Sequence, residues 1–260
     1  MSNKASIAIN FFNNVIGNKQ PACVIAGPCS IESAAQIDRI AASVAASGAT
    51  VLRGGAYKPR TSPQSFQGLG APGYKMLNNS ARKYGLACIA EVIDSNSLAE
   101  AVEYIDIIQI GARNMYNYSL LKEIGKVATP ILLKRGLTAT YQEWLLAAEY
   151  IISHGNPNVI LCERGIRTFE TYTRNTLDLA AVPVMRELCQ LPIVIDPSHG
   201  TGKRSLVPAM SKAALALDVD GLMLEVHYEP ENSISDAAQT ISTTEFENLM
   251  LDIKDYSCIK

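Results

Sequence analysis

The stretch Leu52-Arg53-Gly54-Gly55-Ala56-Tyr57-Lys58-Pro59-Arg60-Thr61-Ser62 contains the unit from which the chain is built, an apolar run that passes through glycine into a polar loop. The apolar run predicts the end of a buried strand, and the glycines let the backbone come close to a ligand. Arg53, Lys58 and Arg60 supply charge-assisted donors suited to carboxylate or phosphate. Taken alone, such cations more often form a solvated loop than an anion site. The interpretation therefore depends on whether the pattern recurs.

The pattern recurs along the whole chain as apolar, β-branched runs, each followed by an amphipathic stretch. The predicted strands are Cys23–Ala26, Thr50–Gly54, Ala87–Val92, Ile107–Gly111, Pro130–Lys134, Val159–Glu163, Pro192–Asp196 and Gly221–Val226. Near-continuous hydrophobicity is typical of parallel strands covered by helices. Eight β/α units predict a single α/β domain, a closed (β/α)8 TIM barrel. A doubly wound open sheet is the alternative, but no G-x-G-x-x-G follows the first strand.

Helical stretches lie between these strands. The predicted helices are Ser33–Ala46, Gly73–Tyr84, Ser97–Tyr104, Ser119–Ile124, Thr140–Ser153, Val182–Cys189, Leu206–Leu217 and Thr244–Ile253. Two sequences match capping boxes, Thr140-x-x-Glu143 and Thr244-x-x-Glu247. Three glycines suit the position just after a helix, namely Gly48, Gly85 and Gly155.

Length and composition favour one domain. The 260 residues suit one barrel over residues 21–260, preceded by an N-terminal extension over residues 1–20 in which Ile7 to Phe12 forms a small strand or plug. The net charge of −2 argues against a general nucleic-acid surface. No apolar run approaches the roughly 18 residues that span a bilayer, and no signal peptide is evident. We expect a soluble cytoplasmic protein with no membrane partner, whose six cysteines are reduced thiols without a C-x-x-C pair.

Basic residues gather just after the predicted strands. Ten of the 23 lie there, namely Arg53, Lys58, Arg60, Arg113, Lys134, Arg135, Arg164, Arg167, Lys203 and Arg204. In a (β/α)8 barrel these positions converge on the active-site end. We therefore expect a cationic mouth that binds a strongly anionic small molecule, carrying phosphate and carboxylate groups.

A second set of residues suits a metal ion. Cys29, His199, Glu225 and Asp236 are scattered in the sequence. Barrel closure makes the seventh, eighth and first strands neighbours, so these groups can meet and bind a first-row divalent ion such as Zn²⁺, Mn²⁺ or Fe²⁺. Singly, each has a plainer explanation: a packed thiol, a helix cap, or an exposed loop carboxylate. The spacing is not that of a zinc finger.

The same strand ends carry a resemblance to a known family. The motifs are Ala26-Gly27-Pro28-Cys29-Ser30, Lys58-Pro59-Arg60-Thr61-Ser62, Ile110-Gly111-Ala112-Arg113, Leu133-Lys134-Arg135-Gly136, Cys162-Glu163-Arg164-Gly165, Asp196-Pro197-Ser198-His199-Gly200 and Glu225-Val226-His227. From Pro21 to Lys254 they resemble 3-deoxy-D-arabino-heptulosonate 7-phosphate (DAHP) synthase, above all its type I-beta branch.

The resemblance implies condensation of phosphoenolpyruvate with erythrose 4-phosphate, the first step of the shikimate pathway and of aromatic amino acid biosynthesis. It implies one divalent metal ion (Mn, Zn, Fe or Co) held by Cys29, His199, Glu225 and Asp236. It places Arg53, Lys58 and Lys134 on the phosphoenolpyruvate carboxylate, Arg113 and Arg164 on its phosphate, and Arg60 and Thr61 on the aldose phosphate. We also expect a homo-oligomer, a dimer or tetramer.

The chemistry calls for proton transfer beside the metal. Water adds at C2 of phosphoenolpyruvate and phosphate departs, which requires fixed cations and a proton donor. Lys58 and Glu91 are the candidates for proton transfer or water positioning, next to Cys29 and His199. Because Glu225 and His227 share one strand face, we expect His227 to border the site without binding the metal.

Three further expectations concern relatives of this family. Its regulated members carry an extra N-terminal domain, so about twenty residues before the barrel imply a catalytic form without built-in feedback control. The nearest rival activity is that of 3-deoxy-D-manno-octulosonate 8-phosphate synthase, which takes arabinose 5-phosphate. Its loop resembles Lys-Ala-Asn-Arg-Ser where this chain has Lys58-Pro59-Arg60-Thr61, and the longer aldose should not fit behind Arg60. A barrel that only binds or regulates is the third alternative.

Overall fold

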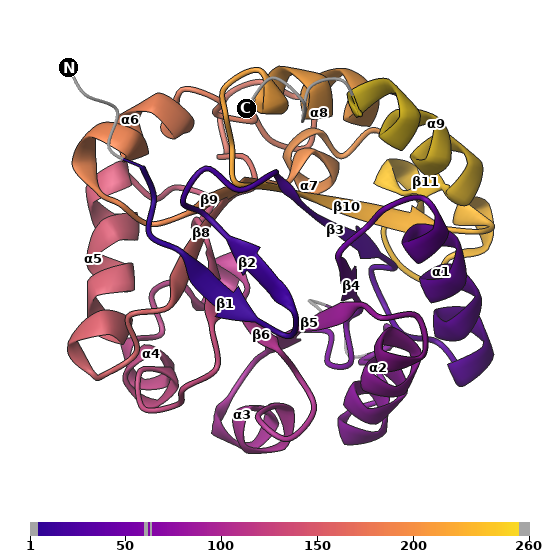
Figure 1. Cartoon of the computed structure of the whole chain (residues 1–260), viewed down its shortest axis with the longest axis horizontal. Helices are drawn as coiled ribbons and strands as arrows, with labels where there is room; N and C mark the ends of the chain where they lie inside the picture. Colours follow the sequence, from indigo (N-terminus) through magenta and orange to yellow (C-terminus); the bar gives the residue numbers. More distant parts are fainter. Residues whose placement is uncertain (1–4, 60–61, 63, 255–260) are drawn as a thin grey trace.

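The computed structural model describes residues 5–59, 62 and 64–254, and its centre is a closed barrel of parallel strands (Figure 1). The strands are β3 (Cys23–Gly27), β4 (Val51–Arg53), β5 (Ala87–Val92), β6 (Ile107–Ile110), β7 (Ile131–Lys134), β8 (Val159–Glu163), β9 (Ile193–Ile195) and β10 (Gly221–His227). They pair in chain order, and β10 closes the ring by pairing with both β9 and β3. The predicted TIM barrel is confirmed, and the open-sheet alternative is wrong.

Helices surround the barrel (Figure 1). They are α1 (Ala34–Ala46), α2 (Ala71–Lys83), α3 (Ser95–Ala101), α4 (Tyr118–Ile124), α5 (Tyr141–Ser153), α6 (Ala181–Leu188), α7 (Pro197–Thr201), α8 (Val207–Leu215) and α9 (Thr243–Ile253), with short 3₁₀ turns η1 (Ala112–Asn114), η2 (Arg204–Leu206), η3 (Pro230–Asn232) and η4 (Ala237–Gln239). Helix α7 was not predicted. Asp196 caps it by accepting a hydrogen bond from the His199 backbone, and Pro197 occupies its first position, so the chain turns into a helix directly after β9.

The predicted helix ends are partly right. Thr140 and Glu143 form the expected capping box at α5. At α9 the box is formed by Ser242 and Glu245, so the prediction of Thr244 and Glu247 is wrong. The two-residue strand β11 (Ile241–Ser242) pairs with β10 and brings the helix start forward. The three predicted end glycines all have positive φ, at 96°, 71° and 118°.

The barrel interior is closed at one end by an apolar plug. Strands β1 (Ile9–Phe11) and β2 (Asn14–Ile16) form an antiparallel hairpin, drawn in indigo across the barrel in Figure 1. Its buried residues Ile9, Phe11 and Ile16 pack against inward-facing strand residues, among them Ile25 and Leu132. The expected plug is confirmed.

The other end of the interior is polar. The hairpin residues and the inward-facing apolar strand residues together form the inner apolar cluster. Six polar residues each lie two positions after a strand residue of this cluster, namely Arg53, Glu91, Gln109, Lys134, Asp196 and Glu225. Because side chains alternate along a strand, the register that buries the apolar residues also points these groups into the barrel. The fold thus gathers charge at the carboxyl ends of the strands.

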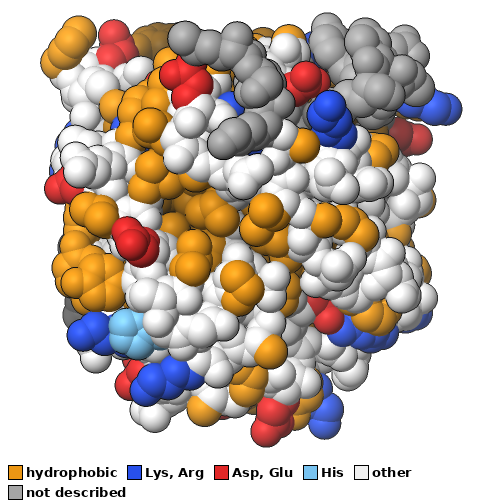
Figure 2. Space-filling model, turned by 60° about the vertical axis from the view of Figure 1, so that its left-hand side comes forward, with side chains coloured by type: hydrophobic (Ala, Val, Ile, Leu, Met, Phe, Trp, Pro, Cys, Tyr) orange, Lys and Arg blue, Asp and Glu red, His pale blue; other side chains and the backbone are white. Residues whose placement is uncertain are grey.

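The outer surface is covered by amphipathic helices. Figure 2 shows the flank that carries α5, where hydrophobic side chains lie among polar ones. The exposed hydrophobic residues of α5 are Leu146, Tyr150 and Ile152, and the centroid of the Tyr150 ring lies 4.6 Å from that of Tyr118 on α4. The expected homo-oligomer stays a prediction.

Within the described residues no helix is long and apolar enough to cross a membrane. The five described cysteines are free thiols, four of them buried.

Candidate active site

A cavity of about 230 Å³ opens at the carboxyl ends of the barrel strands. The described cations that line it are Arg53, Lys58, Arg113, Lys134, Arg164, Arg167 and Arg174. Glu91, His199 and Asp236 line it as well. The cavity therefore combines many positive charges with a few acidic groups, which suits a small anionic ligand.

Not every cation that follows a strand reaches this cavity. Arg135 Nη1 lies 2.9 Å from Glu163 and 2.8 Å from Asp178. Arg135 follows inward-facing Lys134 directly, so strand alternation turns it toward the helices. Arg204 Nε contacts Glu245 at 2.6 Å, and Lys203 Nζ lies 3.1 Å above the Tyr172 ring. The prediction that Arg135, Lys203 and Arg204 line the cationic mouth is therefore wrong. Arg60 and Thr61 lie outside the described residues.

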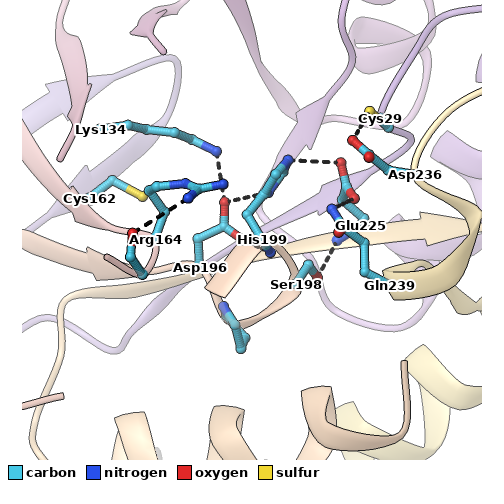
Figure 3. A network of polar contacts seen from close by, with 12 residues as sticks. Cys29, Lys134, Cys162, Arg164, Asp196, Ser198, His199, Glu225, Asp236 and Gln239 are labelled. Atoms are coloured by element: carbon cyan, nitrogen blue, oxygen red, sulfur yellow. Dashed lines mark hydrogen bonds and ion pairs between the residues drawn. The ribbon is translucent and has the colours of Figure 1, made fainter. Parts of the chain in front are cut away.

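Cys29, Glu225 and Asp236 form a compact group of side chains whose chemical types suit metal binding, and this set is the candidate metal-binding group. Their ligand atoms all lie within 4.8 Å of one another. Cys29 Sγ donates to Asp236 Oδ2 at 3.0 Å, and burial raises the pKa of this thiol to about 12 (Figure 3). Glu225 Oε1 is buried and accepts no hydrogen bond in the described part of the chain. A sulfur and oxygen donor set with an unsatisfied buried carboxylate oxygen fits a divalent cation.

His199 adjoins this group from α7. Its Nδ1 lies 2.8 Å from Asp196 Oδ2, and its Nε2 lies 3.3 Å from Glu225 Oε1 (Figure 3). Burial lowers the pKa of His199, which favours the neutral ring that a metal ligand requires. Asp196 fixes the proton on Nδ1, so the Nε2 lone pair is directed at the cluster. The four predicted ligands are thus brought together, with His199 reaching the other three through Glu225.

Ion pairs connect this group to the cations of the cavity. Lys134 Nζ lies 2.7 Å from Asp196 Oδ2, and Arg53 Nη1 lies 3.2 Å from Glu225 Oε1. Lys58 Nζ donates to the Cys29 carbonyl at 2.9 Å and to Cys29 Sγ at 3.0 Å. Lys58 and Arg53 therefore contact the metal-binding group, Lys134 contacts the carboxylate that holds His199, and all three cations line the cavity.

Glu91 is positioned by Gln109 on β6 and by Gly111, which follows that strand. Gln109 Nε2 donates to Glu91 Oε2 at 3.2 Å. A Cβ at Gly111 would lie 2.1 Å from Glu91 Oε1, so glycine is required for the carboxylate to occupy this place. Glu91 consequently faces the cavity at the end of β5.

Arg164 differs from the other buried cations because no carboxylate of the described residues lies within ion-pair distance. It is 6% exposed, and the one side-chain hydrogen bond that it makes to a described residue runs from Nη1 to the Gly165 carbonyl at 3.4 Å. Burial lowers the pKa of Arg164, and nearby Arg174 lowers it further. A buried guanidinium that lacks an acidic partner among the described residues binds an anion favourably, because the anion compensates its buried charge. Arg113, which is exposed, lies in the same cavity.

Comparison with known proteins decides the family. The family model described as DAHP synthetase I family matches residues 3–258. The chain belongs to the DAHP synthetase I family. It is 50% identical over 231 residues to phospho-2-dehydro-3-deoxyheptonate aldolase from Thermotoga maritima, covering 89% of this chain and 68% of that protein. The resemblance to DAHP synthase is confirmed.

A solved structure and a second curated protein are also similar to this chain. A crystal structure of the DAHP synthase from Thermotoga maritima superposes with a TM-score of 0.94 at 47% identity, covering 98% of this chain and 74% of that one. A 2-dehydro-3-deoxyphosphooctonate aldolase from Rhodopseudomonas palustris is 30% identical over 263 residues, covering 94% of this chain and 90% of its own. The chain is thus similar in sequence to both aldolase types, with the higher identity to the heptonate aldolase.

Some residues of the site in this family member were not predicted. Gln109, Arg174, Asn175 and Gln239 line the cavity or contact its acidic groups. Arg174 and Asn175 lie in the loop after β8, which folds back through a bridge between Ile166 and Thr176. No periodicity in the sequence signals such a return. His227 is buried but does not line the cavity, and its Nδ1 accepts a hydrogen bond from the Glu229 backbone.

Proposed function

We propose that the protein condenses phosphoenolpyruvate with erythrose 4-phosphate and water, giving DAHP and inorganic phosphate as the first step of the shikimate pathway. One observation carries the proposal. A group of thiol, imidazole and carboxylate side chains adjoins a cavity that is also lined by a buried arginine, and this arginine has no carboxylate partner among the described residues of a barrel in the DAHP synthetase I family. The similarity to the Thermotoga maritima aldolase supports the same activity.

Phosphoenolpyruvate binds along the cationic side of the cavity. Arg113 and Arg164 hold its phosphate, which supplies the anion that Arg164 lacks among the described residues. Arg53, Lys58 and Lys134 hold its carboxylate. These three already touch acidic or sulfur groups, so their positions are fixed before the substrate arrives. Arg60 and Thr61 bind the aldose phosphate.

Cys29, His199, Glu225 and Asp236 hold one divalent metal ion, whose chemical contribution is to polarise the aldehyde oxygen as a Lewis acid. The neutral ring of His199 suits this role, and so does Glu225 Oε1, which accepts no hydrogen bond from a described residue. Asp196 orients His199 and contacts Lys134, so it joins the metal-binding group to the anion-binding group.

Lys58 and Glu91 transfer the proton that the reaction requires or position the water that adds at C2. Carbon C3 of phosphoenolpyruvate attacks the aldehyde, water adds at C2, and the C–O bond to phosphate breaks. Lys58 Nζ lies beside Cys29, and Glu91 faces the same cavity from β5. Either group can donate a proton within the cationic surroundings that stabilise the departing phosphate.

A coupled assay tests this function. Loss of phosphoenolpyruvate and release of phosphate are measured with aldose phosphates of four and five carbons, in the presence of defined metals. We expect turnover with erythrose 4-phosphate and little with arabinose 5-phosphate. Preference for arabinose 5-phosphate would assign the protein to the octulosonate aldolases, to which it is also similar. Absence of turnover with every aldose and metal would favour a binding or regulatory barrel.

A further inference from the structure

The loop between β8 and α6 is fastened to the helix that carries His199. Arg174 N donates to the Thr201 carbonyl at 2.9 Å, and Asn175 Nδ2 donates to the His199 carbonyl at 3.0 Å. A Cβ at Gly202 would lie 2.4 Å from the Arg174 Cβ, so the loop and the helix end fit closely. This loop begins with Arg164, so it connects the anion-binding side of the cavity with the metal-binding side.

The Arg174 side chain reaches two residues of the metal-binding side. Its Nη1 lies 3.2 Å from Asp236 Oδ1 and 3.0 Å from Gln239 Oε1. Gln239 is buried, and its Nε2 donates to Glu225 Oε2 at 2.5 Å (Figure 3). One guanidinium nitrogen therefore restrains Asp236 directly and Glu225 through Gln239, while the remaining oxygens of both carboxylates stay directed toward Cys29 and His199.

The backbone conformation of Asp236 explains why its carboxylate needs side-chain contacts. Asp236 has φ 54°, in the left-handed region that a non-glycine residue occupies at a cost of about 1 kcal/mol or more. Asp236 belongs to no helix or strand and directly precedes the short turn η4. The orientation of this carboxylate must therefore be held by side-chain contacts, and among the described residues those contacts come from Cys29 and Arg174.

We propose that Arg174 is a positioning residue for the metal centre, holding Asp236 directly and Glu225 through Gln239. This rests on the proposed function, in which those carboxylates bind the metal. Electrostatics alone gives the opposite expectation. A guanidinium beside a cation site repels the incoming ion, so removing the charge should strengthen metal binding if Coulomb forces dominate. Positioning instead requires that metal binding weaken.

The test measures binding of Mn²⁺ alone to metal-free protein by calorimetry, without substrates. Arg174→Met removes the donors and the charge but keeps an unbranched side chain. We expect its affinity for Mn²⁺ to fall about 10- to 100-fold, as for other residues that orient metal ligands. Gln239→Leu should also weaken binding, although it changes no charge. Equal or tighter binding by Arg174→Met would overturn the inference.

Arg167→Met is the matched control. Arg167 comes from the same loop, lines the same cavity and makes no ion pair with a described acidic residue, so its loss should leave Mn²⁺ affinity unchanged or slightly increased. An equal loss in both variants would also overturn the inference, because the effect would then follow from replacing any arginine of the cavity and not from the contacts of Arg174 with Asp236 and Gln239. Thermal unfolding of each variant shows whether the barrel is intact. If the wild-type protein itself binds no divalent metal, the proposed metal centre fails, which is distinct from failure of the Arg174 role.

Discussion

The two ends of the barrel interior are lined by the same strands but by opposite kinds of side chain. At the amino end, Ile9, Phe11 and Ile16 of the hairpin pack against apolar strand residues. At the carboxyl end, two residues further along, the same register carries charges such as Lys134 and Glu225. The apolar end buries surface and stabilises the fold. The charged end desolvates ions, which costs free energy unless partners or ligands compensate.

This difference separates stability from function within one barrel. Substitutions at the charged end that leave no buried acid without its partner should reduce activity with little loss of stability, and substitutions at the plug should do the reverse.

Lys58→Met should have the largest effect. It removes the amine that lies 3.0 Å from Cys29 Sγ and that we assign to proton transfer. Loss of a general acid typically lowers kcat by about 10²- to 10⁴-fold. Steady-state kinetics with saturating substrates measures this, and circular dichroism checks the fold. Unchanged kcat would remove Lys58 from the chemistry and leave Glu91 as the candidate.

Arg164→Ala should weaken phosphoenolpyruvate binding without destabilising the protein. A charge-assisted contact to phosphate contributes roughly 2–3 kcal/mol, so KM should rise about 30- to 150-fold. Because no described carboxylate pairs with Arg164, removing it leaves no buried acid uncompensated. Chemical denaturation should therefore show an equal or greater free energy of unfolding. A large loss of stability with an unchanged KM would contradict the separation.

Ile16→Ala should have the converse effect. Ile16 is 1% exposed in the inner apolar cluster, and such truncations usually cost about 2–5 kcal/mol. The free energy of unfolding should fall by that amount while kcat/KM at 25 °C stays within about twofold of wild type. Val15→Ala is the control, since Val15 is 37% exposed on the same strand and should change stability by less than about 0.5 kcal/mol. A matching loss of activity in Ile16→Ala would show that the two ends are coupled.

The sequence predicts the barrel and much of its charged end for a physical reason. Strand ends of a (β/α)8 barrel must meet, so residues such as Cys29 and Glu225 can be placed together without knowing any distance. The direction of a side chain after its strand is harder to predict. Arg135 and Lys134 are adjacent, and only the register decides that Lys134 enters the cavity while Arg135 pairs with Glu163.

The positions of loop residues cannot be predicted from the sequence for a different reason. Arg174 reaches Asp236 because the chain after β8 folds back onto α7, a return fixed by tertiary contacts such as Asn175 with His199. Helix α9 shows the same dependence. Its start is set by the pairing of β11 with β10, so the capping box forms at Ser242 instead of Thr244.

The most direct test of this account compares wild type with Cys29→Ala before and after chelation. Phosphate release from phosphoenolpyruvate and erythrose 4-phosphate is measured in untreated protein, in chelator-treated protein, and after Mn²⁺ is restored. We predict that chelation abolishes wild-type activity, that Mn²⁺ restores it, and that Cys29→Ala stays inactive throughout while still binding phosphoenolpyruvate at Arg164. Full activity of Cys29→Ala, or full wild-type activity in excess chelator, would contradict the central claim that the charged end of the barrel is a metal-dependent active site.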